Sequence, residues 1–505
     1  MEFITVIAFF IFLFMLIKLL KRSPIKSDLK MPPGPKPLPI IGNMHQLFGS
    51  LAHRTLRDLA IKYGPLMHLK LGEVSTLVVT SPEVAEEFMK THDLQFVNRP
   101  QLISVRIFNY DCTNIAFAPF GEYWRQLRKI CVMELLSTKC VLSFRPIREE
   151  EVLNFIRDIS SNQGSTVNIS RKIFSFTYGL VARVAFGKKS KYQEEFISLM
   201  EVALKMNSGF NAADVYPSVK IIQVISEMSP KLNKMHRALD KILENIVDDH
   251  AQKSRQIVPT DGATKEDLVD VLINAQKSGD SGIPLTKDNI KAVILDIFSA
   301  GSETSSTAVE WAMSEMLKNP GVMKKAQEEV RKAFDGSGNV RESGLHELKY
   351  LQAVIKETFR LHPPVPLLLP RESSEQCNIN GFEIPTKTRV IINAWAISRD
   401  PRHWTDAEKF KPERFLDSTI DYQGKDLKYI PFGAGTGRRI CPGIALGLAS
   451  MELLLAQLLY HFDWKLPGKL KNEQLDMAEA FGLTVRRKND LQLVAVPYKT
   501  GSLLA

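Results

Sequence analysis

Five cysteines are few for a chain of 505 residues. They lie far apart, at positions 112, 131, 140, 377 and 441, and no two of them have a paired spacing. An odd and scattered set implies no disulfide framework and agrees with a protein body in the cytosol. The chain also lacks internal repeats and low-complexity tracts. Its length and its 44% hydrophobic content therefore predict one large globular domain.

A second absence concerns the charge. The formal net charge is +10, but the basic residues form no stripe interleaved with aromatic residues, so we expect no binding to nucleic acid. Residues 1 to 30 hold five basic and two acidic residues, which account for +3 and leave +7 for the rest of the chain. This remaining charge suits the docking of an acidic protein partner.

An apolar run with almost no charge stands at the N-terminus, where Phe3 to Leu20 contains only Lys18. As a helix of 18 residues it would reach about 27 Å, enough for the bilayer of the endoplasmic reticulum. No small-x-small site follows the run, which favours an uncleaved anchor over the alternative, a cleaved signal peptide. Basic residues crowd its carboxyl side, so the positive-inside rule leaves the protein body in the cytosol.

These features divide the chain into three parts. We predict one transmembrane helix over residues 1–20, a basic and proline-rich hinge over 21–40, and a globular domain over 41–505. The protein would then be a single-pass protein of the endoplasmic-reticulum membrane whose domain faces the cytosol.

The hydrophobic pattern of the globular part is mostly helical. Short β-branched runs at 75–80 and 389–393 predict strands, so we expect a mainly α fold with a small β region. Helices are predicted over residues 82–92, 121–136, 145–159, 190–206, 232–254, 286–318 and 320–334.

Cys441 lies in the segment PFGAGTGRRICPG, residues 431–443. Glycines let backbone N–H groups approach the sulfur, and two arginines make the surroundings electropositive, so we expect the thiol to ionise easily. The apolar run 444–459 predicts a helix just after the cysteine, and the helix dipole favours a thiolate further. Such a thiolate is a candidate metal ligand. The alternative is a glycine turn with a buried free cysteine.

This segment resembles the haem-binding loop of the cytochrome P-450 family, whose pattern ends Gly-x-Arg-x-Cys-x-Gly. Gly437, Arg439, Cys441 and Gly443 match the pattern. The resemblance implies haem b with Cys441 as the axial thiolate ligand of its iron, a ligand that favours O–O cleavage. The family places the loop Phe seven residues before the Cys, whereas Phe432 lies nine before it, as if Gly-Thr had been inserted.

The segment AGSETS, residues 300–305, lies within a helix that we predict from an N-cap at Thr286 to a stop at Asn319. A glycine in mid-helix costs about 1 kcal/mol relative to alanine, so thinning the helix must serve a purpose, such as room for dioxygen. The alternative is a kinked helix whose hydroxyls bond back to the preceding turn. In the family an acid–alcohol pair here lies over the distal face of the haem and relays protons; Glu303 and Thr304 match this pair.

Three arginines and a tryptophan match positions that hold haem propionates in the family. Trp124 and Arg128 are four apart and share a helix face, so they can reach one propionate together. Arg371, which follows a proline-rich stretch, and Arg439 match two further propionate positions.

Glu357 and Arg360 are three apart in the helical run 350–361 and can pair on one face. The later sequence Pro-Glu-Arg-Phe resembles the family element that supplies a second arginine, here Arg414, to the buried carboxylate. The resemblance implies that these three residues stabilise the core beneath the haem and take no part in catalysis.

The resemblance covers nearly the whole chain and implies a haem-thiolate monooxygenase, an oxidoreductase that inserts one atom of dioxygen into a small apolar substrate. Electrons would come from NADPH through a membrane-bound flavoprotein reductase, with cytochrome b5 as a second candidate donor. We expect the donor to dock on the cysteine side of the haem, near Arg125, Arg128, Lys129 and Arg438.

The run DMAEAFGLTVRR, residues 476–487, resembles plant microsomal members that oxidise terpenes and terpene-derived alkaloids; phenylpropanoids and amino-acid-derived oximes are alternative substrates. Segments that correspond to the family's substrate contacts are 106–117, 207–210, 297–300, 364–369 and 480–484. Two other functions stay open: an oxygen-independent haem-thiolate isomerase or dehydratase, and a non-enzymatic, membrane-anchored haem sensor or steroid-binding protein.

Overall fold

The computed structural model describes residues 29–49, 51–162, 164–187, 192–206, 210–219, 228–256, 267–279, 282–336, 338–468, 470–480 and 482–498. The predicted anchor, residues 1–20, lies outside these ranges, as do residues 21–28 of the predicted hinge. Within the ranges, α18 (Ile444–His461) is the one helix long and apolar enough to cross a membrane, and 67% of it is buried inside the protein. A helix buried to this extent belongs to the core of the protein.

Helices form most of the fold, and the longest is α14 (Lys287–Lys318), with 32 residues. Thr286 and Asn289 form a reciprocal capping box at its start, as the predicted N-cap requires. The helix ends at Asn319, before the proline that opens α15. The other α-helices are α2 (Ala52–Tyr63), α3 (Pro82–Glu86), α4 (Ile103–Phe108), α5 (Glu122–Cys131), α6 (Thr138–Ser143), α7 (Arg145–Ser160), α8 (Ile169–Phe186), α9 (Gln193–Met206), α10 (Ala212–Val215), α12 (Met228–Gln256), α13 (Leu268–Ser278), α15 (Pro320–Phe334), α16 (Lys349–Leu361) and α17 (Ala394–Ile397).

Two of the predicted helices change their winding before they end. The predicted helix 82–92 is α3 followed by a π-helical turn, Glu87–Thr91. The predicted helix 121–136 is α5 followed by a second π-helical turn, Val132–Leu136. Short 3-10 turns lie at Met44–Gln46, Glu342–Glu347, Pro412–Phe415 and Asn472–Gln474.

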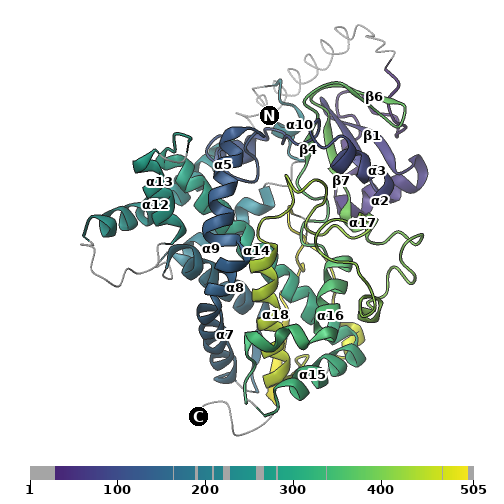
Figure 1. The fold of residues 1–505 in the computed structure, drawn as a ribbon. Coiled ribbons are helices and arrows are strands. Elements are labelled where there is room, and N and C mark those ends of the chain that lie inside the picture. The colour runs from purple at the N-terminus through teal and green to yellow at the C-terminus, as the bar shows by residue number, and fades with distance from the viewer. Residues whose placement is uncertain are drawn as a thin grey trace, which may run out of the picture.

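The main sheet joins distant parts of the chain in the order β1-β2-β7-β4. β1 (Leu66–Leu71) pairs antiparallel with β2 (Val74–Val79), and β2 runs parallel to β7 (Arg389–Ile392). β4 (Arg371–Glu372) pairs antiparallel with β7, so the sheet fixes the position of Arg371. Figure 1 shows this sheet with α2 and α3 on one side of the molecule and the long helices on the other.

Two smaller sheets complete the β portion. β3 (Thr166–Asn168) and β8 (Phe462–Lys465) both pair antiparallel with β9 (Gln492–Pro497). β5 (Cys377–Ile379) and β6 (Phe382–Ile384) form a separate two-stranded sheet. The mainly α fold with a small β region is therefore confirmed.

The sequence pattern missed α8, which packs along α14 and against α7 in the centre of the helical part. Apolar residues cover nearly all faces of α8, and most of its side chains are buried. Because a helix that is buried all round has no polar face, it lacks the amphipathic period that reveals a surface helix.

Candidate active site

A cavity of about 360 Å³ lies between α14, the start of α18 and the segment 431–443. Apolar side chains form most of its wall. Six of the seven site residues that the sequence predicts lie on this wall, namely Arg128, Glu303, Thr304, Arg371, Arg439 and Cys441.

The loop before Cys441 is closed by a backbone hydrogen bond in which Cys441 N donates to Phe432 O at 3.0 Å. Gly433, Gly435 and Gly437 have φ values of +80°, +110° and +88°, in the left-handed region that favours glycine. α18 begins three residues after the cysteine, as predicted. The thiol thus lies where a tight loop meets a helix N-terminus, facing the cavity.

The expectation that the Cys441 thiol ionises easily is wrong for the protein alone. Burial raises its pKa, although a backbone N–H of Gly443 and the charge of Arg128 act in the opposite direction. Removal from water disfavours the thiolate more than these two groups favour it. A bound metal cation would supply the missing stabilisation, because metal coordination deprotonates a thiol.

Four arginines lie on the wall of the same cavity: Arg99, Arg128, Arg371 and Arg439. Burial lowers the pKa of Arg99, and the charges of Arg439 and Arg371 lower it further. The pKa of Arg439 is lowered to about 9 by burial and by Arg371 and Arg128. Such mutual repulsion fits a site that receives an anionic group, and the two carboxylates of haem b meet this requirement.

Arg99 was not predicted from the sequence. Its Nη1 donates to Leu369 O at 2.6 Å and to Pro370 O at 2.9 Å, while its Nε is buried without a hydrogen-bond partner. The local sequence carries no signal for it, because Arg99 follows Asn98 and its acceptors lie far away in the chain.

Trp124 is the seventh predicted site residue. It does not line the cavity that the described residues form, and lies behind its wall. Its indole nitrogen donates to Ile115 O at 2.9 Å. The guanidinium of Arg439 lies 4.5 Å from its ring centroid and that of Arg128 lies 5.4 Å away. Trp124 therefore supports two cavity arginines through cation–π contacts.

The acid–alcohol pair lies in the middle of α14. Thr304 Oγ1 donates to Ala300 O at 2.7 Å, which is the back-bonding that the sequence offered as an alternative. Glu303 is buried, and its Oε1 accepts a hydrogen bond from Thr484 Oγ1 at 2.9 Å. A Cβ at Gly301 would lie 3.3 Å from Val181 Cγ2, so the glycine allows α8 to approach closely.

The predicted core cluster beneath the cavity is present. Arg360 donates to both oxygens of Glu357, at 2.7 Å and 2.9 Å, and neither side chain is exposed. Arg414 Nε donates to Glu357 Oε1 at 3.1 Å, and Lys411 N donates to the same oxygen at 2.8 Å. A buried carboxylate thus holds two arginines together.

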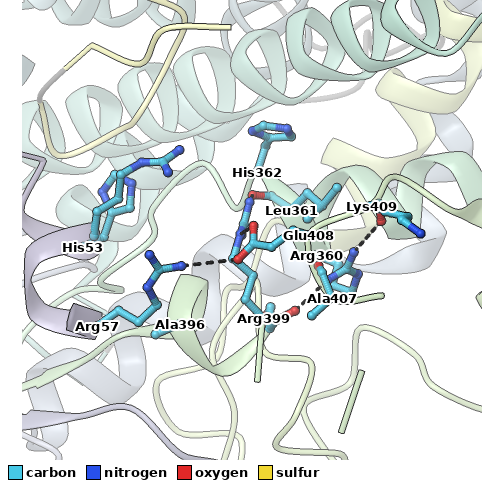
Figure 2. A network of polar contacts seen from close by, with 12 residues as sticks. His53, Arg57, Arg360, Leu361, His362, Ala396, Arg399, Ala407, Glu408 and Lys409 are labelled. Atoms are coloured by element: carbon cyan, nitrogen blue, oxygen red, sulfur yellow. Dashed lines mark hydrogen bonds and ion pairs between the residues drawn. The ribbon is translucent and has the colours of Figure 1, made fainter. Parts of the chain in front are cut away.

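Arg360 also connects the segment 396–409 to α16 through hydrogen bonds. Arg360 Nη1 donates to Ala407 O at 2.7 Å and its Nη2 donates to Lys409 O at 3.1 Å (Figure 2). Arg399 beside it donates to Leu361 O at 2.5 Å and to Glu408 at 3.1 Å. Buried guanidinium groups therefore donate hydrogen bonds to the backbone carbonyls of this irregular segment.

Phe432 lines the cavity in spite of the longer loop. Its ring lies 4.9 Å from that of Phe359 and 5.5 Å from that of Tyr422, measured between centroids. The additional residues have therefore not removed the aromatic packing at this end of the loop.

Most of the predicted substrate-contact segments contribute to the wall. The contributing residues are Phe108, Asn109, Ile115, Ala116, Phe117, Ile297, Ser299, Ala300, Pro364, Val365, Leu368, Leu369, Leu483 and Thr484. Residues 207–209 and 481 lie outside the described residues, and Phe210 lines a smaller neighbouring hollow. The wall also contains Leu180, Val181 and Val184, which were missed because α8 was not predicted. It contains Met200 as well, which lies on the predicted helix α9 but was not assigned to the site.

The sequence model of the cytochrome P-450 family matches residues 32–493 of this chain. The chain belongs to the cytochrome P-450 family. It is a haem-containing monooxygenase, and the family binds its haem iron through an axial cysteine thiolate.

Plant members of the cytochrome P-450 family resemble the chain over its whole length. A cytochrome P-450 of Glycine max is 56% identical over 501 residues, covering 98% of this chain and 96% of that protein. Tabersonine 16-hydroxylase 2 of Catharanthus roseus is 54% identical, covering 98% of each chain. Premnaspirodiene oxygenase of Hyoscyamus muticus is 50% identical, covering 99% of each.

The fold is also that of solved cytochromes P-450. A zebrafish cytochrome P-450 structure with abiraterone superposes with a TM-score of 0.74 at 24% sequence identity, covering 89% of this chain and 99% of that one. This likeness supports the architecture and carries no information on the substrate.

Proposed function

We propose that this cytochrome P-450 oxidises an apolar plant specialised metabolite, a terpenoid or a terpene-derived alkaloid, with electrons from NADPH delivered by a reductase. The observation that carries the proposal is the cavity that places Cys441 and four arginines on a wall otherwise made mostly of apolar side chains. The relatives add the substrate class, since they include hydroxylases and epoxidases of tabersonine and an oxygenase of premnaspirodiene.

Cys441 would hold the haem iron, and the wall arginines would hold the propionates. When bound, haem supplies the activation of dioxygen. Arg128, Arg371 and Arg439 are each fixed by a protein acceptor, namely Ile440 O, Asp93 and Ala118 O. Donors held in this way lose little freedom when they receive a carboxylate, which favours tight binding.

Glu303 and Thr304 would control protons on the other side of the cavity. Thr304 carries its proton at Oγ1, 2.7 Å from Ala300 O. A hydroxyl that gives its hydrogen to the backbone still offers lone pairs to water or substrate in the cavity. Glu303 is held by Thr484, so a carboxylate and a hydroxyl stand side by side at the cavity wall.

The apolar wall would bind and orient the substrate and exclude water. Leu180, Val181 and Val184 of α8 line the cavity, as do Ile297 of α14 and Leu483 near the C-terminus. Burial of a hydrocarbon skeleton against such side chains gains about 25 cal/mol per Å² of apolar surface. A terpene skeleton, which has few polar groups, satisfies this wall without leaving buried donors unpaired.

The membrane placement belongs to the same proposal. Residues 1–20 would anchor the protein in the endoplasmic-reticulum membrane, 21–40 would form the hinge, and 41–505 would be the haem-thiolate catalytic domain in the cytosol. A reductase, and cytochrome b5 as a second donor, would dock where Arg125 and Lys129 are exposed on α5 and Arg438 is partly exposed beside the haem loop. Acidic partners are attracted to such a basic face.

The test is turnover in membranes that contain the full-length chain and a plant reductase. We expect tabersonine or a sesquiterpene hydrocarbon to give an oxygenated product that requires both NADPH and dioxygen, and a C441A variant to give none. Product formation without NADPH would instead indicate an isomerase or dehydratase. Ligand-induced spectral shifts without any product, over a panel of both substrate classes, would indicate a binding protein.

A further inference from the structure

The haem loop holds two more residues between Phe432 and Cys441 than the family pattern has. Because Cys441 N still bonds to Phe432 O at 3.0 Å, the loop closes at its base and the additional length lies at its tip. The tip contains Gly435 and the exposed Thr436.

The tip rests directly on the π-helical turn Glu87–Thr91. A Cβ at Gly435 would lie only 2.0 Å from Met89 O, so the glycine is needed for this close approach. Neighbouring Ala434 is buried and packs in the same apolar cluster as Met89. The tip of the longer loop therefore packs at a defined place, against the π-helical turn.

In this position, Thr436 contacts the buried ion pair between Asp93 and Arg371. Thr436 Oγ1 donates to Asp93 Oδ2 at 2.6 Å. Asp93 Oδ1 accepts from Arg371 Nη1 at 2.8 Å, and Arg438 Nη1 donates to Asp93 Oδ2 at 3.0 Å. Burial acts to raise the pKa of Asp93, but the Thr436 hydroxyl, Arg371 and Arg438 together lower it below its ordinary value.

We propose that Thr436 acts through Asp93 to position Arg371 for a haem propionate, so that the longer loop slows the loss of haem. Arg371 lines the cavity and uses Nη1 for Asp93 and, at 3.4 Å, for Phe96 O. A guanidinium has five N–H donors on three nitrogens, so further donors are available to a propionate. Thr436 is a positioning residue, and the inference rests on the proposed haem site.

The first experiment compares the full-length holoprotein with its T436V and T436S variants. Thr436 is exposed, and valine keeps its shape without the hydroxyl, so both variants should fold and show the haem spectrum of the wild type. The measurement is the rate at which ferric haem passes to excess apomyoglobin. T436V removes the hydrogen bond to Asp93 and the one that Thr436 Oγ1 accepts from Arg438 Nη1. We expect it to lose haem at least about tenfold faster, the factor for one hydrogen bond to a charged group. T436S keeps the hydroxyl and should stay within about twofold of the wild-type rate.

A double-mutant cycle then tests whether the effect passes through Asp93. Asn has a single acceptor oxygen, so D93N cannot serve both Arg371 and Thr436. We expect T436V to change the haem-loss rate of D93N by less than about twofold. A non-additive effect on the haem-loss rate reports coupling between Thr436 and Asp93. A general loosening of the loop would give additive effects.

Equal haem-loss rates for T436V and the wild type, or fully additive effects in the cycle, would overturn the inference while leaving the haem site intact. A wild-type chain without thiolate-bound haem would overturn both the inference and the proposed function. The two failures are therefore distinguished by the spectrum of the wild-type protein.

Discussion

Asp296 is a half-buried carboxylate on the cavity wall of α14 that the sequence analysis did not single out. Its Oδ1 accepts a hydrogen bond from Asn114 Nδ2 at 2.7 Å, and its Oδ2 accepts one from Ala116 N at 2.9 Å. Both donors belong to the loop that leads from α4 to α5 and lines the cavity. We predict the effects of two substitutions of Asp296 on the stability of the protein and on its dependence on pH.

D296A should destabilise the protein. It removes the acceptor for Asn114 Nδ2 and Ala116 N, and each buried donor without a partner costs about 1–3 kcal/mol. The two lost hydrogen bonds lower the free energy of unfolding by about 2–6 kcal/mol. Removal of the charge at pH 7 offsets at most about 3 kcal/mol of this loss. Because the same loop carries Ala116 and Phe117 on the cavity wall, D296A should also weaken substrate binding.

D296N should remove the pH dependence that the Asp296 carboxyl gives to the stability of the protein. Burial raises the pKa of Asp296 from 3.8 to about 6, against the hydrogen bonds from Ala116 and Asn114. An acid with a higher pKa in the folded state binds more protons when folded, so the stability of the wild type falls as the pH rises from about 4 to about 6 and is then constant. The loss amounts to at most about 3 kcal/mol, at 1.36 kcal/mol per pKa unit. Asn stays neutral and avoids this loss, but its single acceptor oxygen leaves either Asn114 Nδ2 or Ala116 N without a partner, at a cost of about 1–3 kcal/mol.

The assay is urea unfolding of the wild type, D296N and D296A, each followed by tryptophan fluorescence and by the haem absorption band. Measurements at pH 5 and pH 7.5 separate the effect of charge from that of shape. The stability of D296N relative to the wild type should be higher at pH 7.5 than at pH 5, since the wild-type carboxyl is mostly ionised only at the higher pH. A stability difference between D296N and the wild type that is the same at pH 5 and at pH 7.5 would refute this reasoning.

Two further predictions concern Glu357 and Thr304. E357Q leaves Arg360 and Arg414 without their buried counter-charge, so the free energy of unfolding should fall by about 3–5 kcal/mol. As a control, the same change at the exposed Glu122 should leave the urea midpoint unchanged. Equal midpoints for E357Q and the wild type would contradict a structural role. T304A should consume NADPH while giving at least about tenfold less product per NADPH, because it removes the hydroxyl at the cavity wall, and T304S should retain the coupling. A T304A variant with the wild-type ratio of product to NADPH would exclude the proton role.

Much of the helical fold could be predicted from local sequence. The capping signal at Thr286 and the proline after Asn319 fix both ends of α14, and α15 was predicted with its observed bounds. The pairing of Glu357 with Arg360 and Arg414 followed from the resemblance, since the spacing alone is common on helix surfaces. α8 could not be predicted because burial on all sides removes its periodicity.

The site was harder to predict where it depends on long-range contacts. Arg99 and Asp296 approach the cavity through partners far away in the sequence, Leu369 for the first and Asn114 for the second. The ionisation of Cys441 was predicted in the wrong direction, because the pattern of glycines and arginines shows the neighbouring donors but not the extent of burial. A single charged residue inside an apolar helical run, such as Asp296, is a signal that could have been used.

The most direct test of the account is the difference spectrum of the membrane-expressed, dithionite-reduced protein with and without carbon monoxide, measured beside C441A. The account predicts a Soret maximum at the long-wavelength position of a thiolate-ligated haem in the wild type and its loss in C441A. An intact thiolate maximum in C441A, or a maximum at the shorter wavelength of neutral or histidine ligation in the wild type, would contradict the assignment of Cys441 as the haem ligand.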